Sequence, residues 1–120
     1  MIKVSLSEGV VFDMLAILLI KSKKSPTLQN TTNYTNFVAQ IKEEIGLDKL
    51  YSVLNSQEFE DLREQNLQTF VAVDSAKDDK ILASVVDSLN FMRYLAKQKL
   101  QETHFNTELT EQKIGYEPRN

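Results

Sequence analysis

Apolar residues recur along the chain at the three- and four-residue spacing of amphipathic helices, and this pattern predicts a small all-α bundle. The first helix is expected over about residues 7–23. It is apolar on nearly every side, so it should lie at the centre of the bundle. Ahead of it, Ile2, Val4 and Leu6 alternate with polar residues, which predicts a short extended N-terminal lead-in.

The middle of the chain is predicted to hold shorter helices. Residues 25–33 are polar and lack periodic apolar positions, so they are expected to form a long loop. Thr35 can cap the helix that follows, and Gly46, a residue that tolerates left-handed dihedral angles, should end it. A short helix is then expected to begin at Asp48.

A further helix should begin at Asn55 or Ser56, either of which can cap it. Its expected inner face holds Phe59, Leu62 and Leu67, and its outer face holds Glu58, Glu60, Asp61 and Glu64. Towards its end, residues 69–73 are rich in β-branched side chains, so this helix can fray or turn extended there.

The last predicted helix is the longest, running from a cap at Ser75 to about Thr103. An apolar stripe follows it at alternating spacings of three and four residues: Leu82, Val85, Leu89, Met92 and Ala96. At 1.5 Å per residue the helix would be about 42 Å long, beyond the roughly 35 Å diameter of a compact domain of this size. Overhanging apolar surface favours association, so we expect a homodimer with this helix at or near a two-fold axis.

The C-terminal segment, residues 104–120, offers an alternative to the dimer. It is polar but carries Phe105, Leu109 and Tyr116. These side chains can fold back and cover the apolar stripe within one chain, or the segment can stay a loosely packed tail.

Composition fits one globular domain over residues 1–120. Apolar residues make up 42% and charged residues 26% of the chain, which places it among folded proteins. Three Gly and two Pro are too few for the turns of a sandwich or barrel. A net charge of -3 gives no broad positive field for phosphates, so no nucleic-acid partner is expected.

Several kinds of site and location are disfavoured. With no cysteine there is no disulfide, thiolate zinc site or cysteine nucleophile. The most apolar stretch, Val10 to Ile20, is interrupted by Asp13 and is shorter than the roughly 20 residues that cross a bilayer. It also lacks the flanks of a secretory signal. We therefore expect a cytoplasmic protein without a membrane partner.

The residue pattern gives little support for a metal site or a cofactor site. His104 is the single histidine, and the carboxylates near it in sequence are Glu102 and Glu108, so a metal site is not predicted. Glycine-rich phosphate-binding motifs do not occur. No cofactor, metal or catalytic residue is predicted.

The acidic cluster of Glu58, Glu60, Asp61 and Glu64 leaves one enzymatic alternative open. All-α nucleotide pyrophosphatases hold Mg²⁺ with a Glu-Glu-x-x-Glu run on one helix and Glu-x-x-Asp on the next. Here Glu43-Glu44 is followed by Leu47, and the long helix offers only Asp87. The alternative is a small Mg-dependent enzyme or a polar-ligand-binding domain related to these enzymes, but a solvated acidic face is favoured.

Residues 13–21, Asp-Met-Leu-Ala-Ile-Leu-Leu-Ile-Lys, resemble a family of small bacterial and phage proteins of unknown function. Those proteins begin with Val-Ser, then Gly-Glu, then Asp-Lys-x-x-Ile-Leu-x-Ile-Lys; here Val10 and Met14 replace the glutamate and the lysine. Towards the C-terminus, those proteins have an arginine on the last long helix, then an asparagine, a Glu-x-Lys and a closing tyrosine. The matching residues here are Arg93, Asn106, Glu111-Gln112-Lys113 and Tyr116. The resemblance implies a compact helical protein without an assigned reaction.

The same positions form the candidate site. Asp13 and Lys21 are two helical turns apart on a helix built for burial, so each charge needs a partner. Such partners could come from Arg93, Glu111 and Lys113. The full candidate set is Asp13, Lys21, Arg93, Asn106, Glu111, Lys113 and Tyr116. We interpret it as a salt-bridge network that pins the tail to the first helix, with a polar ligand pocket as the alternative.

These observations favour a helical protein that acts through protein contacts or assembly and is not an enzyme. The resemblance adds that it is bacterial or phage-encoded. Its partner is expected to be another protein or a second copy of the chain.

Overall fold

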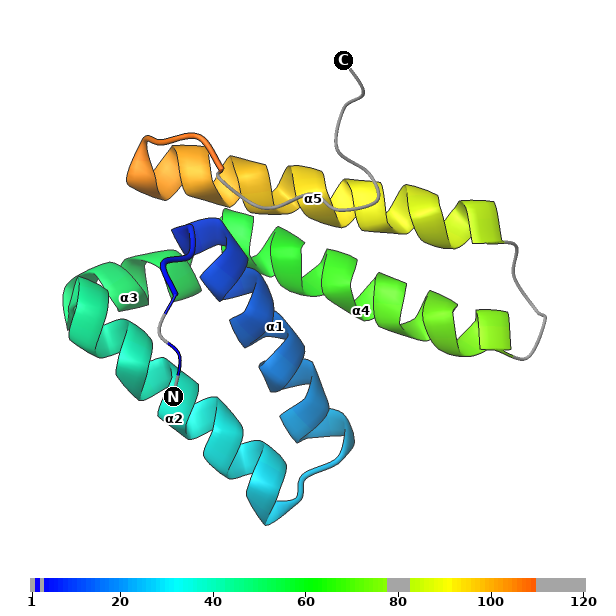
Figure 1. The fold of residues 1–120 in the computed structure, drawn as a ribbon, viewed down its shortest axis with the longest axis horizontal. Coiled ribbons are helices and arrows are strands. Elements are labelled where there is room, and N and C mark those ends of the chain that lie inside the picture. The colour runs from blue at the N-terminus through cyan, green and yellow to red at the C-terminus, as the bar shows by residue number, and fades with distance from the viewer. Residues whose placement is uncertain (1, 3, 78–82, 110–120) are drawn as a thin grey trace.

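The computed structural model describes residues 2, 4–77 and 83–109, and in these ranges it contains five α-helices and no strand (Figure 1). The helices are α1 (Glu8–Lys24), α2 (Leu28–Ile45), α3 (Leu47–Leu54), α4 (Gln57–Lys77) and α5 (Ala83–Phe105). The predicted all-α class is therefore confirmed. Residues 4–7 precede α1 without regular structure, and Ser7 has extended dihedral angles, as a lead-in requires.

The five helices form two groups around α1. In Figure 1, α1 lies between α2 on one side and the antiparallel pair α4–α5 on the other. The short α3 joins α2 to α4 and packs against both. The pair α4–α5 extends past α1, so its far half, next to the connection between the two helices, projects from the rest of the fold.

The last helix, expected over about residues 75–103, begins later and is shorter in the structure. Ser75, predicted to cap the last helix, belongs to α4, and α5 begins only at Ala83. With 23 residues, α5 is about 34 Å long and hardly exceeds the 21-residue α4. This length does not exceed the roughly 35 Å diameter on which the expected overhang was based. The length argument for a dimer is therefore wrong, and Leu82 lies outside the described residues.

Two other expectations about helix bounds are wrong, the first because the initial turns of α2 are polar and show no apolar periodicity. The segment 25–33 is not a loop, since α2 begins at Leu28. Thr27 caps it: its Oγ1 accepts from the N–H of Asn30 at 3.1 Å. The β-branched run 69–73 does not fray but continues α4, where the Thr69 hydroxyl donates to the carbonyl of Gln65 at 2.8 Å.

Two predicted helix boundaries are confirmed. Gly46 ends α2 with a φ of +86°, a conformation that costs glycine little. Ser56 caps α4, and its Oγ accepts from the N–H of Phe59 at 3.2 Å.

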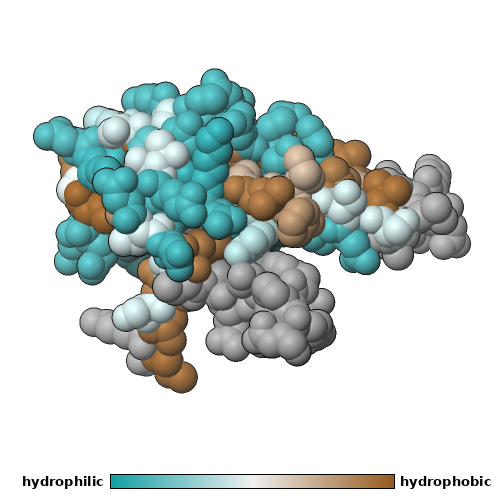
Figure 2. Space-filling view, turned by 90° about the horizontal axis from the view of Figure 1, so that it is seen from above, coloured by the Kyte–Doolittle hydropathy of each residue, from teal (hydrophilic) through white to brown (hydrophobic). Residues whose placement is uncertain are grey.

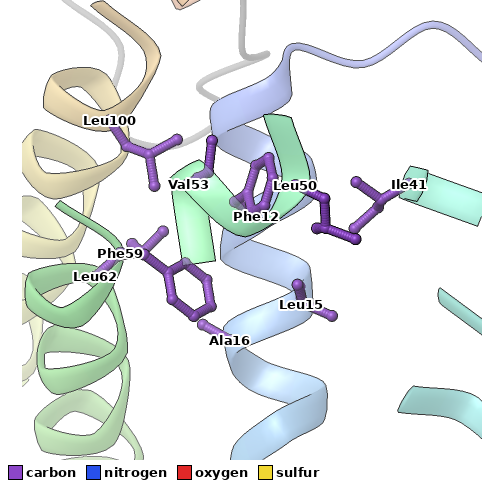
Figure 3. Close-up of a cluster of buried hydrophobic side chains, with 9 residues drawn as sticks. All are labelled: Phe12, Leu15, Ala16, Ile41, Leu50, Val53, Phe59, Leu62 and Leu100. Carbon is purple, nitrogen blue, oxygen red and sulfur yellow. The ribbon is translucent and has the colours of Figure 1, made fainter. Parts of the chain in front are cut away.

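The apolar core lies where the first half of α1 meets α2, α3, α4 and α5, and Figure 3 shows its side chains. It consists of Phe12, Leu15, Ala16, Ile41, Leu50, Val53, Phe59, Leu62 and Leu100. The Phe12 ring packs edge-on against Phe59 at 6.0 Å and lies 6.2 Å from the Phe105 ring. The central position predicted for the first helix is thus confirmed for its N-terminal half. The packing of this core also determines where α4 and α5 cross α1.

Candidate functional site

A buried charged cluster joins α1, α4 and α5 beside the apolar core. Asp13 of α1 is only 3% exposed. The guanidinium of Arg93 on α5 donates to both of its carboxylate oxygens, with Nη2 2.8 Å from Oδ2 and Nε 3.1 Å from Oδ1. The side-chain amide of Asn66 on α4 donates to Oδ1 at 2.8 Å. One carboxylate therefore links three helices.

Lys97 completes the cluster from the next turn of α5. Its Nζ lies 3.7 Å from Oδ2 of Asp13, and the residue is 2% exposed. A carboxylate offers about four lone-pair directions, and the donors of Asn66, Arg93 and Lys97 surround it. Because Asp13 is both buried and surrounded by these donors, its contacts serve to hold the helices in register. The geometry favours the structural interpretation over the ligand pocket.

Gln101 makes a second polar contact between α5 and α1. Its Oε1 accepts from the buried N–H of Gly9 at 2.6 Å, while its Nε2 donates to Thr107 Oγ1 at 2.6 Å and to Glu8 Oε1 at 3.1 Å. This amide supplies the partner that an N–H in the first turn of α1 otherwise lacks. A Cβ at position 9 would lie 2.8 Å from the carbonyl oxygen of Lys97, so the crossing of α1 and α5 requires glycine.

The predicted site residues separate into three groups. Asp13 and Arg93 are brought together, as expected. Lys21 is exposed on the half of α1 beyond the core and lies outside the cluster, so its expected burial is wrong. Asn106 follows α5 with a φ of +54° and is exposed. The remaining members, Glu111, Lys113 and Tyr116, lie outside the described residues, so the pinning of the tail stays a prediction.

Three buried polar residues of this region were not expected: Asn66, Lys97 and Gln101. A signal for two of them exists in the sequence, because Arg93, Lys97 and Gln101 recur every four residues and therefore share one side of a helix. Of these three residues, only Arg93 was expected to face the first helix, as a partner for Asp13. In the structure all three contact α1.

His104 pairs with an acidic residue that was expected to point outwards. Its Nε2 lies 2.9 Å from Oε1 of Glu58, which is partly buried, so the outward assignment of Glu58 is wrong. Next to it, Lys49 of α3 donates to the carbonyl of His104 and its Nζ lies 4.9 Å from the centre of the Phe105 ring. A cation at this position interacts favourably with the C-terminal end of the α5 dipole.

The carboxylates considered for magnesium do not gather in the part of the chain that the structure describes. Glu43 and Glu44 are exposed on α2, whereas Asp87 is exposed on α5. Across the described ranges, no group of three His, Asp or Glu side chains is placed to hold a metal ion.

A third feature is the outer face of α5, defined here by Val85, Phe91, Met92 and Leu95. Phe91, Met92 and Leu95 are 54%, 45% and 39% exposed. Val85 and Met92 belong to the stripe that was expected to pack against other helices or a second copy, and both are exposed in the structure because Arg93 and Lys97 take the side of α5 that faces α1. Figure 2 shows brown surface gathered over the projecting half of the molecule, while the opposite end is mostly teal.

The amphipathicity of α5 is thus inverted in its central turns, with charge inside and apolar side chains outside. Among the described residues, no helix has both the length and the apolarity to cross a bilayer. Comparisons of the chain with protein-family models, curated proteins and solved structures found no significant match.

Proposed function

We propose that this protein is a non-catalytic helical module that acts through protein–protein contacts, and that the outer face of α5 is its contact surface. The observation that carries the proposal is the exposure of Phe91, Met92 and Leu95 within little more than one turn of a single helix. A contiguous apolar patch on a water-soluble surface marks an interaction site more often than scattered apolar residues do. Aromatic residues and methionine are enriched at such sites.

The charge distribution along α5 supports the same proposal. Between Ala83 and Ala96 the helix has two charged residues, Asp87 and Arg93, and Arg93 is turned towards Asp13. The outer face is therefore poor in charge, in a chain of which 26% is charged. Depletion of charge is what distinguishes the buried centre of protein interfaces from ordinary surface.

The buried cluster gives this surface a fixed support. Arg93 and Gln101 hold α5 against α1 from the side opposite the outer face. Because α5 is anchored along two turns, the exposed side chains are presented by a rigid element, and binding loses little backbone entropy. The cytoplasmic location and the bacterial or phage origin stay predictions from the sequence pattern and the resemblance.

A site-specific photocrosslink in the native cells tests the proposal. A benzophenone amino acid replaces Phe91 in one variant and Glu64, exposed on α4, in a matched control. We expect a protein adduct at position 91 that is absent at position 64 and disappears when Leu95→Glu is added. Equal labelling at both positions, or no adduct at position 91, would refute the contact function.

A further inference from the structure

We infer that the occupant of the outer face is the same face of a second copy, with the two α5 helices packed antiparallel about a two-fold axis. The inference rests on the proposed function and adds the partner and its register. It is carried by the order of side chains along α5, which is self-complementary when the helix is reversed.

The line along which the two helices would touch, called the seam here, follows from the spacing of the outward residues of α5. Positions at alternating intervals of four and three residues lie along one side of α5: Ser84, Ser88, Phe91, Leu95, Gln98 and Glu102. Each of them is exposed or partly exposed. The spacing is the one that two helices need to pack along each other.

Antiparallel pairing about the midpoint between Phe91 and Leu95 gives complementary layers. Phe91 lies opposite Leu95 of the second copy, and both large apolar side chains meet at the two-fold axis. In the next layer Ser88 lies opposite Gln98 of the second copy. A short hydroxyl side chain there faces a long amide, so the layer has both the space and the hydrogen-bonding groups for contact.

The outermost layer repeats this match, with Ser84 opposite Glu102 of the second copy, where a hydroxyl can donate to a carboxylate. Parallel pairing lacks this complementarity. It would place Glu102 opposite Glu102 of the second copy and serine opposite serine, which combines like-charge repulsion with unfilled space.

The side chains that lie beside the seam on one side are also compatible with a second copy. Met92 lies close to the two-fold axis, where it would meet Met92 of the second copy. Further out, Val85 would lie beside Lys99 of the second copy, whose methylene groups can cover it while the ammonium stays in water. The seam and the side chains beside it therefore place no pair of like charges opposite each other.

Sedimentation velocity at tens of micromolar tests whether the pair forms. We expect a mass twice the 13.8 kDa of one chain. Met92→Lys should return it to one chain with unchanged helicity by circular dichroism. The matched control Gln68→Lys, on an exposed position of α4, should leave the dimer intact. A dimer that survives Met92→Lys would overturn the assignment of this face.

Disulfide formation tests the register, because the chain has no cysteine of its own. We expect a mixture of Ser88→Cys and Gln98→Cys chains to form the mixed disulfide much faster than either variant crosslinks with itself. Preferential crosslinking of Ser88→Cys with itself would overturn the antiparallel register while leaving self-association intact.

The two proposals fail in different ways. If the chain stays at the mass of one copy at all concentrations, self-pairing is wrong. A photocrosslink from position 91 to a different protein would then still support the contact function. If position 91 also gives no adduct, both proposals are wrong.

Discussion

Asp13→Asn should destabilise the fold strongly, because it removes the one carboxylate at the centre of the buried cluster. The substitution keeps the size of the side chain and its Oδ1 acceptor. It replaces the other oxygen with an amide whose hydrogens would face the guanidinium of Arg93 and the ammonium of Lys97. Two buried or partly buried cations thus lose the negative charge that compensates them.

The expected cost follows from the burial of the partners. Breaking a buried ion pair by removing one member typically costs about 3–5 kcal/mol. The Arg93 side chain is 26% exposed and can recover some hydration, so the lower end applies. We expect a loss of about 3 kcal/mol in the free energy of unfolding. For a chain of this size the fall in Tm would be roughly 10–15 °C.

Urea unfolding followed by circular dichroism measures this difference. Asp61→Asn is the matched control, since it makes the same charge change at an exposed site on α4 where the carboxylate accepts from Gln57. Its effect should stay within about 0.5 kcal/mol. Arg93→Gln should cost less in the Asp13→Asn background than in the parent, because the two residues share one interaction. If both aspartate variants unfold with the parent, the cluster does not stabilise the fold.

Three further outcomes are expected. Gly9→Ala should lose about 1–3 kcal/mol in urea unfolding, because its Cβ would meet the carbonyl of Lys97 at 2.8 Å; an unchanged midpoint would contradict the close crossing of α1 and α5. Lys49→Met should lower the free energy of unfolding by about 1 kcal/mol through the lost contact with the end of α5, and equal stability would show that this contact contributes nothing. Calorimetry should detect no tight zinc binding, because His104 has Glu58 and no second histidine beside it; micromolar binding that disappears in His104→Ala would refute the prediction that no metal site forms there.

Helix positions could be predicted from the sequence wherever a local signal marks a boundary. Gly46 and Ser56 act through their own dihedral angles and hydroxyl, so short-range chemistry determines both. The start of α2 was missed because its first turns are polar and exposed, so no apolar period reveals them. Likewise, Ser75 has the residue type of a cap, yet α4 continues past it.

The contact between Asp13 and Arg93 was predictable because a charge inside the most apolar segment must have a partner. The burial of Lys97 and Gln101 is signalled by their four-residue spacing from Arg93. The burial of Asn66 was not predictable, since it depends on which side of α4 faces α1. An apolar stripe normally marks the buried side of a helix. In α5 the polar partners required by α1 decide the orientation, and Met92 and Leu95 are left in water.

The contact between Gly9 and Gln101 bears on the order in which the chain can fold during synthesis. These residues are 92 positions apart, so α1 leaves the ribosome long before its first turn can acquire its cap. The Asp13 carboxylate likewise has to stay hydrated until Asn66 and Arg93 have been added. While α1–α3 emerge alone, water must therefore satisfy the groups that α4 and α5 later cover. A ribosome stalled before codon 101 would hold a nascent chain whose first helix still frays.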